Sequence, residues 1–412
     1  MRHAHIIGGG LAGLSAALAL TEAGCGVTLY EAAPVAGGRC RSYFDRELGL
    51  TIDNGNHMLL TGNRAAFAYI AEIGAAAKLD GPRRARFPFI EIPTGERWTL
   101  RPNRGRIPWW VLLPPFRVPG TRLADYRALR RLGSLTGDAT VASALRHGRL
   151  YWRLIEPLAI AALNTPPQDA LARLLGAVVR ETLLAGGGAC LPRFPREGLS
   201  AALIDPAVEM LRARGATLHV GRRISALDID TGWITGLQTT EGAVALGPDD
   251  AVVLAVPSWV ATDLLPDLVA PDAFEAILNI HFRVEADAGE AGFVGVIGGT
   301  AEWVFVKPGH VSVTISAANR MVDRPAEAIA AAVWPDVRAA LGLAGEMPPF
   351  RVVKERRATF AATAAQEARR PGARTALANL ALAGDWTATG LPATIEGAIR
   401  SGRTAAEVVL RN

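Results

Sequence analysis

Lysine, cysteine and long apolar runs are scarce in this sequence. Only three of its 412 residues are lysines, so arginine supplies nearly all of the positive charge behind the net charge of +5. Because no lysine-rich run or basic–aromatic stripe is present, we expect no nucleic-acid partner. The cysteines, Cys25, Cys40 and Cys190, are odd in number and lack metal-ligand spacing, which argues against a disulfide framework and a metal site.

No apolar run reaches the roughly 20 residues that a membrane-spanning helix needs. No secretion signal is recognisable, because a strand pattern begins almost at Met1. We therefore expect a cytoplasmic protein that is soluble or binds the inner face of the cell membrane peripherally. Half of the residues are apolar and a fifth are charged, which is typical of a packed globular protein. A chain of this length exceeds one ordinary core and predicts two domains.

Three glycines near the start of the chain have the G-x-G-x-x-G spacing of a dinucleotide-binding turn. They follow a short apolar strand, His5–Ile7, and precede a helix with an apolar face. Gly8 and Gly10 allow a tight turn and close approach to a pyrophosphate, while Gly13 lets the helix pack on the strand. Free N–H groups in the first helical turn suit the same anion. The predicted contacts are Gly8, Gly10, Leu11, Ala12 and Gly13.

A second strand, Val27–Tyr30, ends in an acidic residue. Glu31 is expected to accept hydrogen bonds from a ribose diol and to disfavour a 2′-phosphate. Because two strands, a helix and this acid occur at the right spacing, we favour dinucleotide binding over a glycine-rich turn that binds nothing. In the loop that follows, Gly38 allows close backbone approach and Arg39 offers a bidentate donor, so both are predicted to contact a second phosphate.

This combination resembles the FAD-binding superfamily that includes amine oxidases and carotenoid desaturases. The end of the chain resembles it too, because an apolar strand ends in Gly384 and Asp385. The resemblance places these two residues at the ribityl chain and pyrophosphate of a non-covalently bound FAD. It also implies that Thr394, Ile395 and Glu396 open a last helix whose N-terminus faces the isoalloxazine ring. Glu396 has an alternative role as a plain helix-start carboxylate.

The resemblance covers the whole chain and predicts an α/β fold. It implies a Rossmann-like FAD-binding domain of the glutathione-reductase type, interleaved with an α+β substrate domain. The FAD-binding domain is expected to be discontinuous and to comprise residues 1–62, 195–260 and 355–412. In its middle part a strand should pass the adenine, with a backbone contact at Ile224. The substrate domain would comprise residues 63–194 and 261–354.

The string Asp53-Asn54-Gly55-Asn56-His57 narrows the resemblance. It looks like the corresponding string of the hydroxysqualene dehydroxylase family of hopanoid synthesis, and so do Asn279–Arg283 and Gly390–Ala398. Thr394 stands where an amine oxidase typically carries an aromatic residue beside the amine. Asn279 is the nearest counterpart of the lysine that amine oxidases often direct toward the flavin. Amine oxidation is therefore a minor alternative.

The family resemblance implies reductive dehydroxylation of hydroxysqualene, a long apolar isoprenoid, to squalene. This reaction needs a proton for the leaving oxygen, a hydride from reduced FAD and a dry channel. His57 and Asp53 are candidates for the acid or its orienter, and His281 is a third catalytic candidate. Each has a structural alternative, in which His57 bonds a loop, Asp53 accepts from backbone N–H groups, and His281 is a core histidine.

Other interpretations stay open from the sequence. An FAD-dependent desaturase would move hydride in the opposite direction, from a polyene to the flavin. A flavin-carrying accessory protein would present a lipid without chemistry of its own. The electron donor is unknown, because no second nucleotide-binding repeat follows the first. The apolar segment Ile107–Phe116, flanked by arginines, is either a contact with the membrane surface or a buried core segment.

Overall fold

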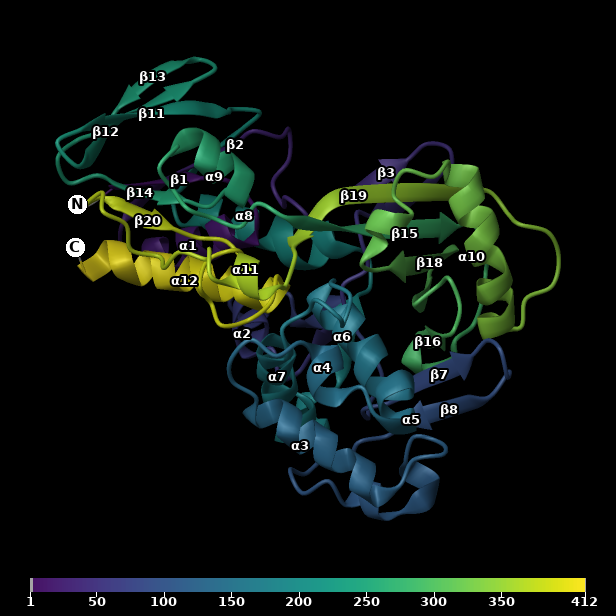
Figure 1. Ribbon diagram of the computed structural model, residues 1–412. Coiled ribbons are helices and arrows are strands. Elements are labelled where there is room, and N and C mark those ends of the chain that lie inside the picture. Colours follow the sequence, from purple (N-terminus) through teal and green to yellow (C-terminus); the bar gives the residue numbers. More distant parts are fainter. Residues whose placement is uncertain (1–2, 412) are drawn as a thin grey trace.

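The structure is a computed structural model that describes residues 3–411, so residues 1, 2 and 412 of the expected FAD-binding domain lie outside the described part. Two parts are visible in Figure 1. One is built on a five-stranded parallel sheet, and the other combines a seven-stranded sheet with a group of helices. The predicted α/β fold with a Rossmann-like FAD-binding part is confirmed.

The parallel sheet has the strand order β10-β2-β1-β14-β20, and all of its neighbouring strands run in the same direction. Its strands are β1 (His3–Ile7), β2 (Gly26–Glu31), β10 (Thr217–Val220), β14 (Ala251–Leu254) and β20 (Leu380–Leu382). Every residue of β14 is buried, as expected for a short apolar strand whose sheet is covered on both faces. The predicted strand–helix–strand opening is therefore present at the centre of this sheet.

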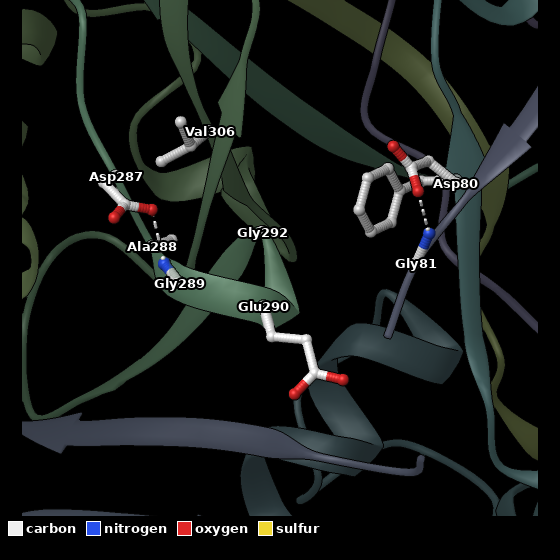
Figure 2. A pocket seen from close by; sticks show the side chains of 9 residues that line it. Asp80, Gly81, Asp287, Ala288, Gly289, Glu290, Gly292 and Val306 are labelled. Atoms are coloured by element: carbon white, nitrogen blue, oxygen red, sulfur yellow. Dashed lines mark hydrogen bonds between the residues drawn. The ribbon is translucent and has the colours of Figure 1, made fainter. Parts of the chain in front are cut away.

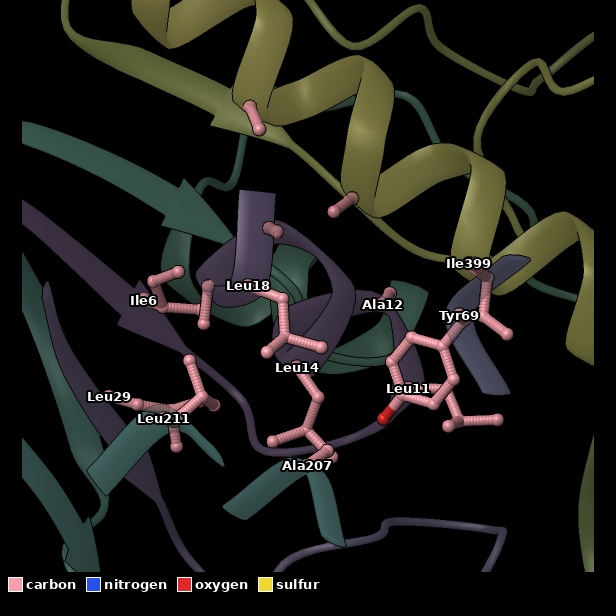
Figure 3. Packing of buried hydrophobic residues seen from close by; sticks show 14 of the residues in the cluster. Ile6, Leu11, Ala12, Leu14, Leu18, Leu29, Tyr69, Ala207, Leu211 and Ile399 are labelled. Carbon is pink, nitrogen blue, oxygen red and sulfur yellow. The ribbon is translucent and has the colours of Figure 1, made fainter. Parts of the chain in front are cut away.

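Helix α1 (Leu11–Glu22) and the last helix, α12 (Ile395–Arg411), pack against each other, and each contacts strands of the parallel sheet. Figure 3 shows the α1 side chains Leu14 and Leu18 among residues of the first two strands, with Ile399 of α12 nearby. The Ser15 hydroxyl donates a hydrogen bond of 3.0 Å to the Ile399 carbonyl and ties the two helices together. Nearly every residue of α1 is buried, which explains why the helix is apolar on all sides.

Further elements complete this part. Helix α8 (Asp205–Ala213) contacts α1, and α2 (Arg64–Glu72) contacts α12. An antiparallel sheet contains β11 (Ile224–Asp230), β12 (Trp233–Thr239) and β13 (Gly242–Ala245). Helix α9 (Ser258–Leu264) contacts β11.

The second part contains a seven-stranded sheet with the order β19-β15-β18-β17-β16-β7-β8. Its strands are β7 (Phe87–Glu91), β8 (Arg97–Leu100), β15 (Phe274–Phe282), β16 (Phe293–Ile297), β17 (Trp303–Lys307), β18 (His310–Ile315) and β19 (Phe350–Phe360). Helix α10 (Ala326–Leu341) packs on one face through Val333 and Val337, against alternate residues such as Leu278 and Ile280. Because side chains alternate along a strand, the residues between these face the other way, toward the first part.

Short helices form a separate core against β7 and β8. They are α3 (Arg127–Ser134), α4 (Val141–Leu145), α5 (Gly148–Leu150), α6 (Glu156–Leu163) and α7 (Ala172–Glu181). Two small sheets are also present, and α11 (Ala364–Glu367) follows β19. One sheet pairs β3 (Ser42–Asp45) with β4 (Leu50–Asp53), and the other has the order β5 (Leu59–Leu60), β9 (Pro192–Pro195), β6 (Leu79–Asp80).

The last expected domain boundary, at residue 355, falls inside β19, because this strand pairs with β15 over nearly its whole length. We propose that the third FAD-binding segment begins after β19. We also propose that the first segment extends through α2, which packs in the core of the parallel-sheet part, and that the second extends to the end of α9. Among residues 3–411, no helix is long and apolar enough to cross a bilayer.

Candidate active site

The glycine turn between β1 and α1 is shaped to receive an anion. Gly8 has φ +111°, a conformation that favours glycine. Gly10 is the N-cap of α1, and no side chain caps this helix or places an acid in its first turn. A Cβ atom built at Gly10 would meet no atom within 4 Å. The uncapped N–H groups of Leu11 and Ala12 therefore adjoin open space, which fits the pyrophosphate of FAD.

The end of β2 and the start of β11 meet beside this turn. The N–H groups of Gly9 and Ala33 donate to the two carboxylate oxygens of Glu31, each over 2.7 Å. The Arg222 N–H donates to the Glu31 carbonyl over 2.9 Å, two residues before Ile224. The structure thus brings Glu31 and Ile224 to one place, as adenosine binding requires. The contact of the carboxylate with a ribose stays a prediction.

Arg39 joins the exposed Gly38 loop to the end of β20. Its Nη2 donates to Asp385 Oδ1 over 2.7 Å, and its Nη1 donates to the Ala358 carbonyl over 2.6 Å. The Asp385 side chain is 8% exposed and the Arg39 side chain 34%, so only the carboxylate end of this ion pair is shielded from water. We expected the Arg39 guanidinium to bind a phosphate, but its two terminal nitrogens donate to oxygen atoms of Ala358 and Asp385 instead. The preceding Gly384 donates its N–H to Ser401 of α12.

Arg370 is a buried cation in this region that no sequence pattern indicated, since it lies among other arginines before a proline. Its side chain is 1% exposed and forms an ion pair with Glu367. It donates hydrogen bonds to the carbonyls of Asp385, Thr387 and Leu391 and to the Thr389 hydroxyl. Arg370 therefore holds together the loop that connects β20 to α12.

Two of the residues expected at the start of α12 stabilise helices. The Thr394 hydroxyl caps α12 by accepting from the Gly397 N–H over 3.0 Å. Glu396 is 2% exposed, and its carboxylate accepts from Ala65 and Ala66 in the first turn of α2. It also forms an ion pair with Arg400. The Glu396 carboxylate therefore has a structural role at the positive end of α2, and the contact of the α12 N-terminus with the flavin stays a prediction. Ile395, beside them, is buried.

Asp53 is ionised, and both of its carboxylate oxygens accept hydrogen bonds. Its Oδ1 accepts from the Ser42 hydroxyl over 2.6 Å and from the Leu199 N–H over 2.8 Å. Its Oδ2 lies 2.6 Å from Lys307 Nζ. Although burial opposes ionisation, Lys307 and these hydrogen bonds hold the pKa of Asp53 below its ordinary value. As a carboxylate, Asp53 has no proton to donate, so it can orient a neighbouring acid but cannot be the acid itself. Lys307 was not predicted, although a lone lysine ending a strand of alternating aromatic residues is a usable signal.

His57 ends this loop, and its side chain is partly buried. Burial lowers the pKa of His57 to about 4, and the charges of Arg39 and Lys307 act in the same direction against Asp53. The imidazole is therefore neutral at pH 7. It can donate or accept a hydrogen bond but does not carry a second proton to give away.

His281 lies in the core of the protein. It is fully buried, and its Nδ1 shares a hydrogen bond of 3.0 Å with the Ser312 hydroxyl. Burial, helped by the charges of Lys307 and His310, lowers the pKa of His281 to about 3. The Asn56 loop lies against the face of β15 that carries His281 and favours the core-histidine alternative, while a catalytic role of His281 stays a prediction. Asn56 Nδ2 donates to the same Ser312 hydroxyl over 2.8 Å.

Asn279 fastens this loop to the sheet. Its Nδ2 donates to the Asn54 carbonyl over 3.2 Å, and its Oδ1 accepts from the Thr314 hydroxyl over 2.9 Å and from the Asn56 N–H over 3.3 Å. Asn279 therefore holds the Asn54–Asn56 backbone against the sheet. The lysine that reaches the Asp53–His57 loop is Lys307 of β17, whereas Asn279, the counterpart proposed from the sequence, lies on β15.

The face of the seven-stranded sheet that looks toward this loop is divided into a polar and an aromatic half. The polar half consists of Asn279, His281, His310, Ser312 and Thr314, from β15 and β18. The aromatic half consists of Phe87, Phe293, Trp303 and Phe305, from β7, β16 and β17. Met58, next to His57, packs against the aromatic half. Lys307 lies on β17 where the two halves meet.

A surface cavity of about 240 Å³ opens on the outer side of the aromatic half. Figure 2 shows Asp80 and Gly81 on one side and Asp287, Glu290 and Val306 on the other. Phe194 lines the cavity and also packs on the aromatic half. None of the residues predicted for FAD or catalysis lines it, so the cavity is separate from the candidate cofactor site.

Comparison with known proteins shows the family and the fold of the chain. The family model described as flavin containing amine oxidoreductase matches residues 11–287 and 305–410. Hydroxysqualene dehydroxylase of Sinorhizobium fredii is 49% identical over 410 residues, covering 99% of this chain and 98% of the relative. That of Rhodopseudomonas palustris is 50% identical over 412 residues, covering 98% of each. The structure of putrescine oxidase bound to putrescine superposes with a TM-score of 0.72 at 16% identity and full coverage of both chains, which shows a shared fold.

Proposed function

Because the chain belongs to the flavin-containing amine oxidoreductase family and, within it, to the hydroxysqualene dehydroxylases, we propose that it converts hydroxysqualene to squalene. It is an FAD-dependent oxidoreductase. The observation that carries the proposal is the divided sheet face beside His57, with polar groups at one end and aromatic rings at the other. This arrangement suits a long apolar molecule with a single hydroxyl group.

The reaction converts an allylic alcohol and reduced FAD into a hydrocarbon, water and oxidised FAD. When bound, reduced FAD supplies the hydride, and the site must supply one proton to the leaving oxygen. The neutral His57 ring would form a hydrogen bond with the substrate hydroxyl group. The Asp53 carboxylate would hold the charged Lys307 side chain in position beside it. The aromatic half would exclude water along the isoprenoid chain and protect a cationic carbon from hydrolysis.

The decisive test mixes anaerobically reduced enzyme with hydroxysqualene in detergent and follows flavin reoxidation. Squalene is measured by mass spectrometry, and deuterium-labelled reduced flavin traces the hydride. We expect squalene to form in step with flavin reoxidation and to contain deuterium. A parallel reaction of oxidised enzyme with phytoene tests the desaturase alternative. Desaturation of phytoene without conversion of hydroxysqualene would refute the proposed direction of hydride transfer.

We further propose that the segment Ile107–Phe116 contacts the membrane surface from which the substrate is taken. Ile107 is 78% exposed and Leu112 is 57% exposed, although both are large apolar residues. Trp109, Leu113, Leu123 and Trp152 are also exposed. In Figure 1 the segment lies at the far end of the helical group, beyond α3 and α5. Neighbouring exposed arginines such as Arg104 and Arg106 complement anionic lipid headgroups.

Replacing two of these residues should weaken lipid binding without unfolding the protein. We expect the double variant Ile107→Ser, Leu112→Ser to bind vesicles of anionic phospholipid at least about tenfold more weakly, because two apolar side chains no longer enter the lipid. Vesicle co-sedimentation measures this. Val269→Ser, which changes an apolar residue of 60% exposure elsewhere on the surface, is the matched control. Equal binding by all three proteins would refute the membrane contact.

A further inference from the structure

Lys307 is a cationic proton-bearing group in direct contact with the Asp53–His57 loop. Its Nζ lies 2.6 Å from Asp53 Oδ2, and its side chain is 14% exposed. An ammonium carries three N–H donors, and Asp53 takes one of them. Within residues 3–411 no other acceptor forms a hydrogen bond with Nζ. Two N–H donors of Lys307 are therefore free for a ligand.

The other charged and titratable groups around Lys307 are unsuited to donate a proton. Asp53 is held as a carboxylate by its three hydrogen-bond donors. His57 and His281 have a lowered pKa and are neutral at pH 7, chiefly because they are buried. His310 is likewise buried, with a lowered pKa. The guanidinium of Arg39 does not lose its proton in proteins.

The position of Lys307 matches what an amphipathic substrate requires. It ends β17, whose preceding inward side chains are Trp303 and Phe305 of the aromatic half. Across the ladder it pairs with His310 of the polar half. An isoprenoid chain that lies along the aromatic residues would bring a hydroxyl group to the end of the strand, where Nζ lies.

We propose that Lys307 is the catalytic acid that protonates the leaving hydroxyl group, with Asp53 as its positioning partner. This inference rests on the proposed dehydroxylation. A proton moves from Nζ to the oxygen, the C–O bond breaks with its electron pair on oxygen, and water leaves. Bound reduced FAD would supply the hydride for the new C–H bond, and the Lys307 amine would then take a proton from solvent.

The ion pair also provides an electrostatic reason for this choice. Before the proton transfer, Lys307 and Asp53 together are neutral. After it, the Asp53 carboxylate is no longer balanced, just when positive charge develops on the allylic carbon. The low exposure of Asp53, 3% for its side chain, strengthens this attraction because little water screens it.

The variants Lys307→Arg and Lys307→Met separate an acid from a structural cation. Arginine keeps a positive charge for Asp53 but does not release a proton, whereas methionine removes both functions. We expect Lys307→Arg to retain FAD and thermal stability, yet to form squalene about 100-fold more slowly or worse, like Lys307→Met. Lys354→Arg, a lysine on the outer strand β19, is the control and should keep wild-type activity.

The outcomes distinguish this inference from the proposed function. If wild-type enzyme forms squalene and Lys307→Arg does so at a comparable rate, Lys307 is only a structural cation and the inference is wrong. If wild-type enzyme does not form squalene, the proposed function fails and the acid role falls with it. Loss of squalene formation in Lys307→Arg with normal flavin content and melting temperature supports the acid role.

Discussion

Replacing Gly13 with alanine should cost the protein its FAD and much of its stability, whereas the same change at Gly10 should leave the fold intact. A Cβ at Gly13 would lie 1.9 Å from the Gly8 carbonyl oxygen and 3.3 Å from the Ala255 Cβ. The helix must move away from β1 to relieve this overlap, at a cost of about 1–3 kcal/mol. Gly10 has φ −77°, and a Cβ there meets nothing within 4 Å.

The two variants separate folding from cofactor binding within one motif. For Gly13→Ala we expect a lower melting temperature in the apoprotein and at least about tenfold weaker FAD binding, from the same displacement of the helix. For Gly10→Ala we expect an unchanged apoprotein melting temperature but weaker FAD binding, because the methyl group enters the open space before α1. Calorimetry of apoprotein and FAD titration measure both effects. Equal apoprotein melting temperatures for Gly13→Ala and wild type would contradict the packing argument.

Replacing Arg370 with methionine should destabilise the protein by about 3–5 kcal/mol, because several buried acceptors lose their donor together. The carbonyls of Asp385, Thr387 and Leu391 all accept from this one guanidinium. The loop before α12 should then loosen, and FAD should dissociate more readily. The melting temperature and the flavin-to-protein ratio after gel filtration measure the two consequences.

Its neighbour Arg369 is a matched control. Arg369 pairs with Asp272, and the two side chains are 40% and 64% exposed, so Arg369→Met should cost less than about 1 kcal/mol. Lysine at position 370 should rescue little, because an ammonium cannot reproduce the planar fork that reaches three carbonyls. If Arg370→Met melted at the temperature of Arg369→Met, the loop would not depend on this residue.

The parts of the protein that could be predicted from sequence are those whose interactions are local in the chain. The glycine spacing, the helix and the acid at Glu31 lie within one continuous stretch, and hydrophobic periodicity indicates their arrangement directly. The string around Asp53 and His57 was also recognisable as a motif. Period-two alternation along a strand tells which residues share a face with His281, but it does not indicate what covers that face.

The sequence by itself determined the class of fold, the family and the FAD-binding opening, because each depends on residue types at short, regular spacing. The tertiary structure alone decided which side chains are free to act. Lys307 forms an ion pair with Asp53, which lies 254 residues earlier in the chain. Glu396 accepts a hydrogen bond from Ala66 at the start of α2, 330 residues earlier. Such contacts depend on the register of distant strands and on how helices pack, and no local pattern encodes either. For this reason the candidate acid became visible only when β17 was placed beside the Asp53 loop.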